Sequence, residues 1–150
     1  PFDVAVTVVD AESCEPIEGA AVDVWHCDAE GVYSGVEGDS GTFLRGVQMT
    51  GADGAASFRT IFPGWYTGRA VHSHLKVALG TDDVHTGQLF FDDALSEQVY
   101  GSGVYASKGT PDRPNAADSI FNESGGATLL AVTQDGDSYR TTFSIAVQLV

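Results

Sequence analysis

The sequence predicts an all-β fold, an antiparallel β-sandwich with long loops and little helix. Residues of the strand-forming types Val, Thr, Phe and Ile recur with period-two alternation along the chain. Clusters of Gly, Asp, Ser and Pro separate these segments, as turns do between short antiparallel strands. Many short strands at such spacing are typical of a sandwich.

The strands can be placed by following the alternation from the N-terminus. A segment qualifies where β-branched or aromatic residues alternate with polar ones between turn residues. The expected strands are Phe2 to Asp10, Ala21 to His26, Leu44 to Thr50, Ala55 to Thr60, Ala70 to Leu79, Gln88 to Phe91, Ala127 to Thr133 and Arg140 to Val150.

Turn signals join some of these segments. Asp53-Gly54 and the run Gln134 to Asp137 are strong turn signals, and both predict hairpins. Asp92 to Tyr100 has modest helical character, and Gly101 to Asn115 is punctuated by Gly and Pro and is expected to be loop.

Length and charge limit the classes of function. A chain of 150 residues predicts one domain, 1–150. A formal net charge of −14 with seven Lys and Arg would repel phosphate backbones and anionic headgroups, so we expect no nucleic-acid and no membrane partner. No apolar run approaches the ~20 residues of a spanning helix. The chain begins with Pro1, so we expect an upstream segment, a targeting signal among the candidates.

Two cysteines, Cys14 and Cys27, flank a turn and a strand-like segment. Antiparallel neighbours at this spacing can approach within bridging distance, which favours a disulfide and an oxidising compartment. The alternative is a pair of buried free thiols.

Histidines form the first candidate site. In the segment Arg69 to Val77, His72 and His74 alternate with core-type residues, so both imidazoles would share one face of a strand. Such a pair is either half of a metal site or a pair of surface or hydrogen-bonding histidines. The sequence has no C-x-x-C and no H-E-x-x-H, and Met49 has no Cys and His partners of the kind found in blue-copper sites.

Anionic ligands for a metal could be carboxylates or tyrosine phenolates. Tyr66 lies in a tight turn, Phe62 to Arg69, that leads into the histidine strand, and Tyr33 follows the strand that ends at His26. For each tyrosine alone, an aromatic side chain that closes the end of a sandwich is an alternative.

Four segments together resemble one family. They are WHCDAEGVYS from Trp25, FLRGVQMT from Phe43, ASFRTIFPGWY from Ala56 and GRAVHSH from Gly68. In this order they are similar to the intradiol ring-cleavage dioxygenases, and especially to their small secreted branch. The resemblance runs from about Thr7 to Phe91.

The resemblance implies the site and its cofactor. It assigns Tyr33, Tyr66, His72 and His74 as ligands of Fe(III), Tyr66 and His74 axial and Tyr33 and His72 equatorial, with a hydroxide as the fifth ligand. It also assigns Arg69 and Gln88 to the active site. Two phenolates and a hydroxide would neutralise the charge of ferric iron, which agrees with this ligand set.

The resemblance further implies a reaction. Catechol-type diols and O2 would be the small-molecule partners, the ring would open between its hydroxyls, and the products would be cis,cis-muconates. Tyr66 would leave the metal and take a substrate proton. The family also implies long active-site loops, a secreted location and, elsewhere in the full-length protein, a carbohydrate-binding module. The larger members also have a helical N-terminal region, which we expect this chain to lack because it starts at the first expected strand.

Two other functions stay open from the sequence. Pro16 to Val24 resembles a strand-turn-strand unit found in non-catalytic, prealbumin-like β-sandwich binding modules. Alternatively, His72 and His74 could hold zinc with Asp82 or Asp83, as in a zinc hydrolase.

Overall fold

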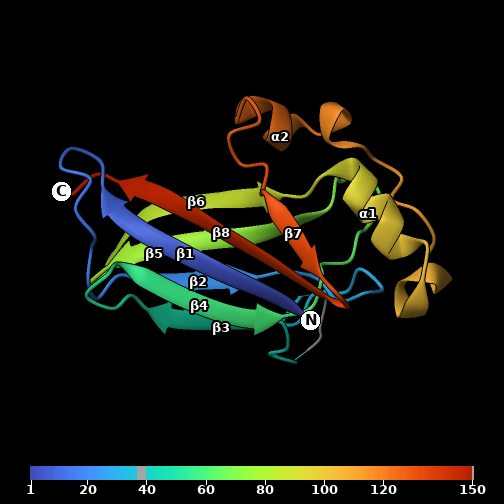
Figure 1. Ribbon diagram of the computed structural model, residues 1–150, viewed down its shortest axis with the longest axis horizontal. Coiled ribbons are helices and arrows are strands. Elements are labelled where there is room, and N and C mark those ends of the chain that lie inside the picture. The colour runs from blue at the N-terminus through green and yellow to red at the C-terminus, as the bar shows by residue number, and fades with distance from the viewer. Residues whose placement is uncertain (37–39, 150) are drawn as a thin grey trace.

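A computed structural model describes residues 1–36 and 40–149 as two packed four-stranded sheets (Figure 1). The first sheet has the order β4 (Ala55–Thr60), β1 (Phe2–Asp10), β8 (Ser138–Val147) and β7 (Val132–Asp135). The second has the order β3 (Arg45–Met49), β2 (Ala21–Trp25), β5 (His72–Leu79) and β6 (Asp82–Phe90). The predicted β-sandwich is confirmed.

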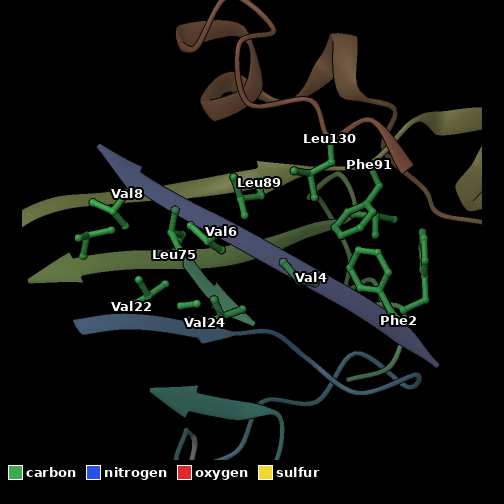
Figure 2. Packing of buried hydrophobic residues seen from close by; sticks show 14 of the residues in the cluster. Phe2, Val4, Val6, Val8, Val22, Val24, Leu75, Leu89, Phe91 and Leu130 are labelled. Carbon is green, nitrogen blue, oxygen red and sulfur yellow. The ribbon is translucent and has the colours of Figure 1, made fainter. Parts of the chain in front are cut away.

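The core lies between the two sheets. Phe2, Val4, Val6 and Val8 of β1 are buried at alternate positions, so one face of this strand is wholly apolar. Figure 2 shows these side chains packing against residues of the second sheet, among them Leu75 of β5. Each fully buried side chain of this size contributes about 1.5–3 kcal/mol. Burial of this face fixes the register of β1.

The predicted strands agree with the observed ones to different extents. The bounds of β1 and β4 were predicted correctly. Strand β6 begins at Asp82, before the predicted Gln88, because Gly80 (φ 60°) permits a short turn directly after β5. Strand β7 begins at Val132 instead of Ala127. Val150, the end of the last predicted strand, lies outside the described residues.

Among the named strands of the described residues, the pairing is antiparallel except between β1 and β8. These two strands pair in parallel over their length, from Phe2 opposite Tyr139 to Asp10 opposite Val147. The predicted Asp53-Gly54 hairpin is wrong, because β3 and β4 belong to different sheets and the turn crosses between them. The hairpin at Gln134 to Asp137 is confirmed by the pairing of Asp135 with Ser138.

Short helices gather in the segment between β6 and β7 (Figure 1). The predicted helix is α1 (Asp93–Tyr100), which Asp92 caps through the amide of Leu95. The expected loop, Gly101 to Asn115, contains one 3₁₀ helix, Gly103–Ser107. A second, Asn115–Ala117, begins at its last residue, and α2 (Ser119–Glu123) follows. In the described part of the chain, no helix has the length and apolar character to cross a membrane.

The predicted disulfide is wrong. Cys14 and Cys27 are both free, and Cys14 is exposed whereas Cys27 is buried. Cys14 lies in the turn after β1, before β2 begins, and Cys27 lies two residues beyond the last residue of β2. Strand β2 therefore separates the two cysteines, which lie beyond its opposite ends as free thiols.

Candidate metal centre

Strand β5 places two histidines on the outer face of the second sheet. His72 and His74 alternate with Ser73 and Leu75, which are buried. His74 lies opposite Trp25 of β2 on one side and opposite Gln88 of β6 on the other. The period-two pattern thus brings the imidazoles together, with ring centroids 5.0 Å apart.

The orientation of His72 is fixed by the backbone. Its Nδ1 lies 2.7 Å from the carbonyl oxygen of Ala70, and a carbonyl can only accept, so Nδ1 carries the hydrogen. The lone pair of Nε2 is then free to bind a metal. Burial lowers the pKa of His72 to about 4, so the ring is neutral at pH 7.

Two tyrosine hydroxyls converge on this same nitrogen. The oxygen of Tyr66 lies 3.2 Å and that of Tyr33 3.4 Å from Nε2 of His72. The two tyrosine rings come from different loops and contact each other edge to face, with centroids 5.7 Å apart.

Two glycines allow these loops to approach closely. A side chain at Gly64 would overlap the carbonyl oxygen of Asp28, and one at Gly31 would overlap that of Trp65. Gly31 also has φ 86°, which disfavours other residues. Gly31 and Gly64 each lie two residues before a candidate tyrosine ligand, so close backbone contact sets the distance between the phenols.

Three of the four candidate ligands, Tyr33, His72 and His74, lie in a poorly hydrated environment. Burial, and then the neighbouring Cys27 and Tyr66, raise the pKa of Tyr33 well above its ordinary value. Burial, followed by the nearby His72, lowers the pKa of His74 to about 4. The site therefore disfavours charge on either residue, and a phenolate here requires a strong positive partner.

Arg69 and Gln88 lie beside the tyrosine. The Nη2 of Arg69 donates to Oε1 of Gln88 at 2.6 Å, and its Nη1 lies 3.5 Å from the hydroxyl of Tyr66. Asp118 binds the other edge of the guanidinium, with Oδ2 2.8 Å from Nε. All six residues singled out from the sequence therefore lie in one cluster.

A ladder of planar groups crosses the sheet at His74. The indole of Trp25 stacks on the imidazole, and the guanidinium of Arg45 lies 4.6 Å above the Trp25 ring. Arg45 in turn binds Asp23 at 2.6 Å. Arg45, Trp25 and His74 lie directly opposite one another on neighbouring strands, and the Cβ atoms of such pairs are about 4.5–5.5 Å apart, so their planar groups can stack.

The donor set fits ferric iron better than zinc. Within residues 1–36 and 40–149, no three His, Cys, Asp or Glu side chains form a metal-binding group. Asp82 and Asp83 pair with Leu79 and Ala78, at the far end of β5 from His72, and Asp83 binds Lys76. Two phenol oxygens and two imidazole nitrogens remain as donors, and as phenolates the two oxygens would offset two of the three charges of a hard trivalent ion.

The other two histidines do not join the site. His26 contacts the carbonyl oxygen of Cys27 and the hydroxyl of Thr60, each at 2.8 Å. His85 lies opposite Val77, nearer the hairpin end of β5.

Comparison with known proteins decides the family. The family model described as Dioxygenase matches residues 2–92, which contain all six candidate residues. The chain belongs to the intradiol ring-cleavage dioxygenase family. An intradiol ring-cleavage dioxygenase of Tetranychus urticae has a similar structure, with a TM-score of 0.92 and 30% identity over 98% of this chain and 80% of that chain.

Two further dioxygenases are also similar to this chain. The dioxygenase domain of a dioxygenase and carbohydrate-binding protein fusion from Streptomyces sp. SirexAA-E matches with a TM-score of 0.74 and 30% identity, over 99% of this chain and 80% of that chain. A chlorocatechol 1,2-dioxygenase of Cupriavidus pinatubonensis is 31% identical over 117 residues, 64% of this chain. The alignment covers 46% of that relative, so the chain spans about half the length of the curated relatives it matches.

The structure also shows partners that the sequence did not predict. Asp118 lies outside the matched residues, and its position just before a short helix is a capping signal, but nothing in the sequence links it to Arg69. Trp25 could have been found from strand register, since it and His74 fall on neighbouring strands. Membership of the intradiol dioxygenases favours an enzyme over the non-catalytic binding module.

Proposed function

We propose that this chain is a non-haem Fe(III) intradiol dioxygenase that cleaves catechol-type diols with O2 to cis,cis-muconates. The observation that carries the proposal is the convergence of the Tyr33 and Tyr66 hydroxyls on Nε2 of His72, within 3.4 Å and 3.2 Å. We assign Tyr33, Tyr66, His72 and His74 as the iron ligands. Family membership supports the assignment, and the neutral imidazoles supply the remaining donors.

The bound metal would supply Lewis acidity toward the catechol oxygens and the positive charge that the two phenolates require. The chain itself supplies a site with few competing charges. His72 and His74 stay neutral over the physiological pH range, so they remain available as ligands. Trp25 covers one face of His74 and limits the access of water to it.

Tyr66 is the proton acceptor that we assign to the reaction. Its oxygen lies next to Nη1 of Arg69, at 3.5 Å, so a cation faces the position where charge changes. A catechol hydroxyl that approaches this oxygen can pass its proton to Tyr66. Arg69, with Gln88 held at 2.6 Å, then stabilises negative charge on the substrate, an effect that is commonly a few kcal/mol in a partly desolvated site.

The cations on this face are already paired with carboxylates, so we expect the site to prefer uncharged catechols. Arg69 is paired with Asp118, Arg45 with Asp23 and Lys76 with Asp83. A carboxylate on the substrate ring would therefore meet paired cations in a protein of net charge −14. We expect kcat/KM for catechol to exceed that for 3,4-dihydroxybenzoate, and the opposite order would reject this preference.

Product analysis under ¹⁸O₂ tests the reaction. In intradiol cleavage both atoms of O2 enter the product, so one catechol and one O2 together give one muconic acid, with no other atom gained or lost. We expect a muconate that gains label from O2 and has an absorption maximum in the ultraviolet. A yellow semialdehyde, formed by cleavage beside the diol, would reject the proposal, as would an unlabelled product.

Location and further domains belong to the same proposal. We propose an extracellular enzyme, although the free cysteines remove the disulfide as an argument for it. The Streptomyces relative is described as a fusion with a carbohydrate-binding protein. We propose such a module for the full-length protein, and sequencing of the complete gene tests it.

A further inference from the structure

A single buried carboxylate joins the helical segment to the candidate active site. The side chain of Asp118 has 1% of its surface exposed, and both of its oxygens are fully engaged. Oδ1 accepts from the amides of Ile120 and Phe121 at 3.0 Å and 3.3 Å and so caps α2. Oδ2 accepts from Nε of Arg69 at 2.8 Å and from the amide of Ala70 at 3.0 Å.

We propose that Asp118 is a positioning residue that orients both Arg69 and His72 for the reaction. The inference rests on the proposed function. Asp118 makes no hydrogen bond to any of the four candidate ligands, so it acts through Arg69 and Ala70, which it binds directly. It also lies beyond residues 2–92, so this positioning role is not assigned by the family match.

The first path runs through the guanidinium. Asp118 engages Nε at 2.8 Å and Nη2 at 3.4 Å, which fixes the plane of the guanidinium. The remaining nitrogen, Nη1, then points to the hydroxyl of Tyr66, while Nη2 also reaches Gln88. Without a partner on the Nε side, Arg69 could rotate away from Tyr66.

The second path runs through the backbone of Ala70. Its amide donates to Oδ2 of Asp118, and its carbonyl oxygen accepts from Nδ1 of His72 at 2.7 Å. The carboxylate therefore fixes the segment that selects the tautomer of His72. Such supporting partners typically change metal affinity or activity about 10- to 100-fold when removed.

The charge of Asp118 matters separately from its capping role. Arg69 is only partly exposed, with 23% of its side chain accessible, and Asp118 is its only salt-bridge partner in the described residues. Asn caps helices about as well as Asp, so Asp118→Asn retains a capping side chain and removes the charge. Asp92, which caps α1 and is exposed, offers a matched control because it binds Leu95 and makes no contact with Arg69.

The experiment compares Asp118→Asn and Asp118→Ala with Asp92→Asn and Asp92→Ala. In iron-free protein, ¹⁵N NMR follows the Nε–H signal of Arg69, assigned by its loss in Arg69→Lys. We expect its hydrogen exchange to quicken at least tenfold in both Asp118 variants and to stay unchanged in both Asp92 variants. In iron-loaded protein, kcat for catechol should fall about 10- to 100-fold in Asp118→Asn, with folding shown by an unchanged near-ultraviolet circular dichroism spectrum.

Two results would overturn the inference. One is Asp118→Asn with an unchanged Arg69 signal, which would mean that Asp118 does not hold the guanidinium. The other is a faster exchange with kcat within twofold of the wild type, which would mean that the orientation of Arg69 is unimportant. If the wild-type protein cleaves no catechol, the proposed function fails, whereas the NMR comparison still tests whether Asp118 holds Arg69.

Discussion

The indole of Trp25 lies face to face with the imidazole of His74, with ring centroids 4.8 Å apart and 4° between the planes. Both side chains project from paired positions on neighbouring strands, so the stacking follows from the register of β2 and β5. The stack supports His74 through one face of its imidazole ring. The pairing of β2 with β5 thus helps to hold a candidate metal ligand in place.

Replacing Trp25 by Leu should weaken the support of His74. We expect iron to be lost about tenfold more readily, as measured by competition with a chelator, because the imidazole gains freedom to rotate. Arg45→Met serves as the comparison, since it removes the cation above Trp25 but leaves Trp25 stacked on His74. Equal iron retention in wild type and Trp25→Leu would show that the stack has no such role.

His72→Ala should abolish stoichiometric iron binding, because it removes the nitrogen on which both tyrosine hydroxyls converge. His85→Ala is the matched control, since His85 lies on β6 away from this cluster. Metal analysis after gel filtration measures both. We expect about one iron per chain in the control and less than about a tenth of that in His72→Ala. Full occupancy in His72→Ala would remove it from the ligand set.

Asp118 should make the stability of the iron-free protein depend on pH in acid. Burial alone would raise the pKa of Asp118, but hydrogen bonds from Arg69, Ala70 and Phe121 lower it to about 2. A carboxyl whose pKa is lower in the folded state stabilises the fold above its unfolded pKa of about 4. That contribution is lost as the pH falls from about 4 through about 2.

Urea unfolding of wild type and Asp118→Asn checks this dependence. The free energy of unfolding of the wild type should exceed that of the variant at pH 6, and the difference should shrink steadily between pH 4 and pH 2. A difference that stays constant across this range would show that the charge of Asp118 is not linked to folding.

The two cysteines should differ in reactivity. Cys14 is exposed, whereas Cys27 is 1% exposed and burial raises its pKa to about 12. Iodoacetamide at pH 8 should therefore modify one thiol in the native protein and both after unfolding, as mass spectrometry would show. A chain that takes up no label even when unfolded without reductant would instead contain a disulfide.

The sequence predicted the strands well where apolar and polar residues alternate. It did not predict which strands pair when they lie far apart in the sequence. Strand β1 was predicted with correct bounds because Phe2, Val4, Val6 and Val8 form an unbroken apolar face. Its parallel pairing with β8 joins residues more than 130 positions apart, and alternation does not contain that information. The part of β6 before Gln88, Asp82 to Gly87, was missed because Asp82 and Asp83 resemble turn residues.

Some residues of the candidate site could be predicted from the sequence pattern, and others could not. His72 and His74 share a face because strand residues alternate, which is visible in the sequence. The assignment of Tyr33 and Tyr66 as ligands depended on the family resemblance. Both lie in loops that approach each other at Gly31 and Gly64, and loops have no periodic sequence pattern. Asp118 and Arg69 are 49 positions apart in the sequence, so their contact could be found only from the structure. The same holds for the positions of Cys14 and Cys27 beyond opposite ends of β2.

The visible spectrum of the iron-loaded protein tests the central claim most directly. We expect one equivalent of ferric iron to give a red-brown tyrosinate charge-transfer band, which Tyr33→Phe and Tyr66→Phe each reduce by roughly half because two phenolates contribute. Anaerobic catechol should shift the band of the wild type to longer wavelength. A colourless iron-bound protein, or a band unchanged in both tyrosine variants, would contradict the assignment of Tyr33 and Tyr66 as iron ligands.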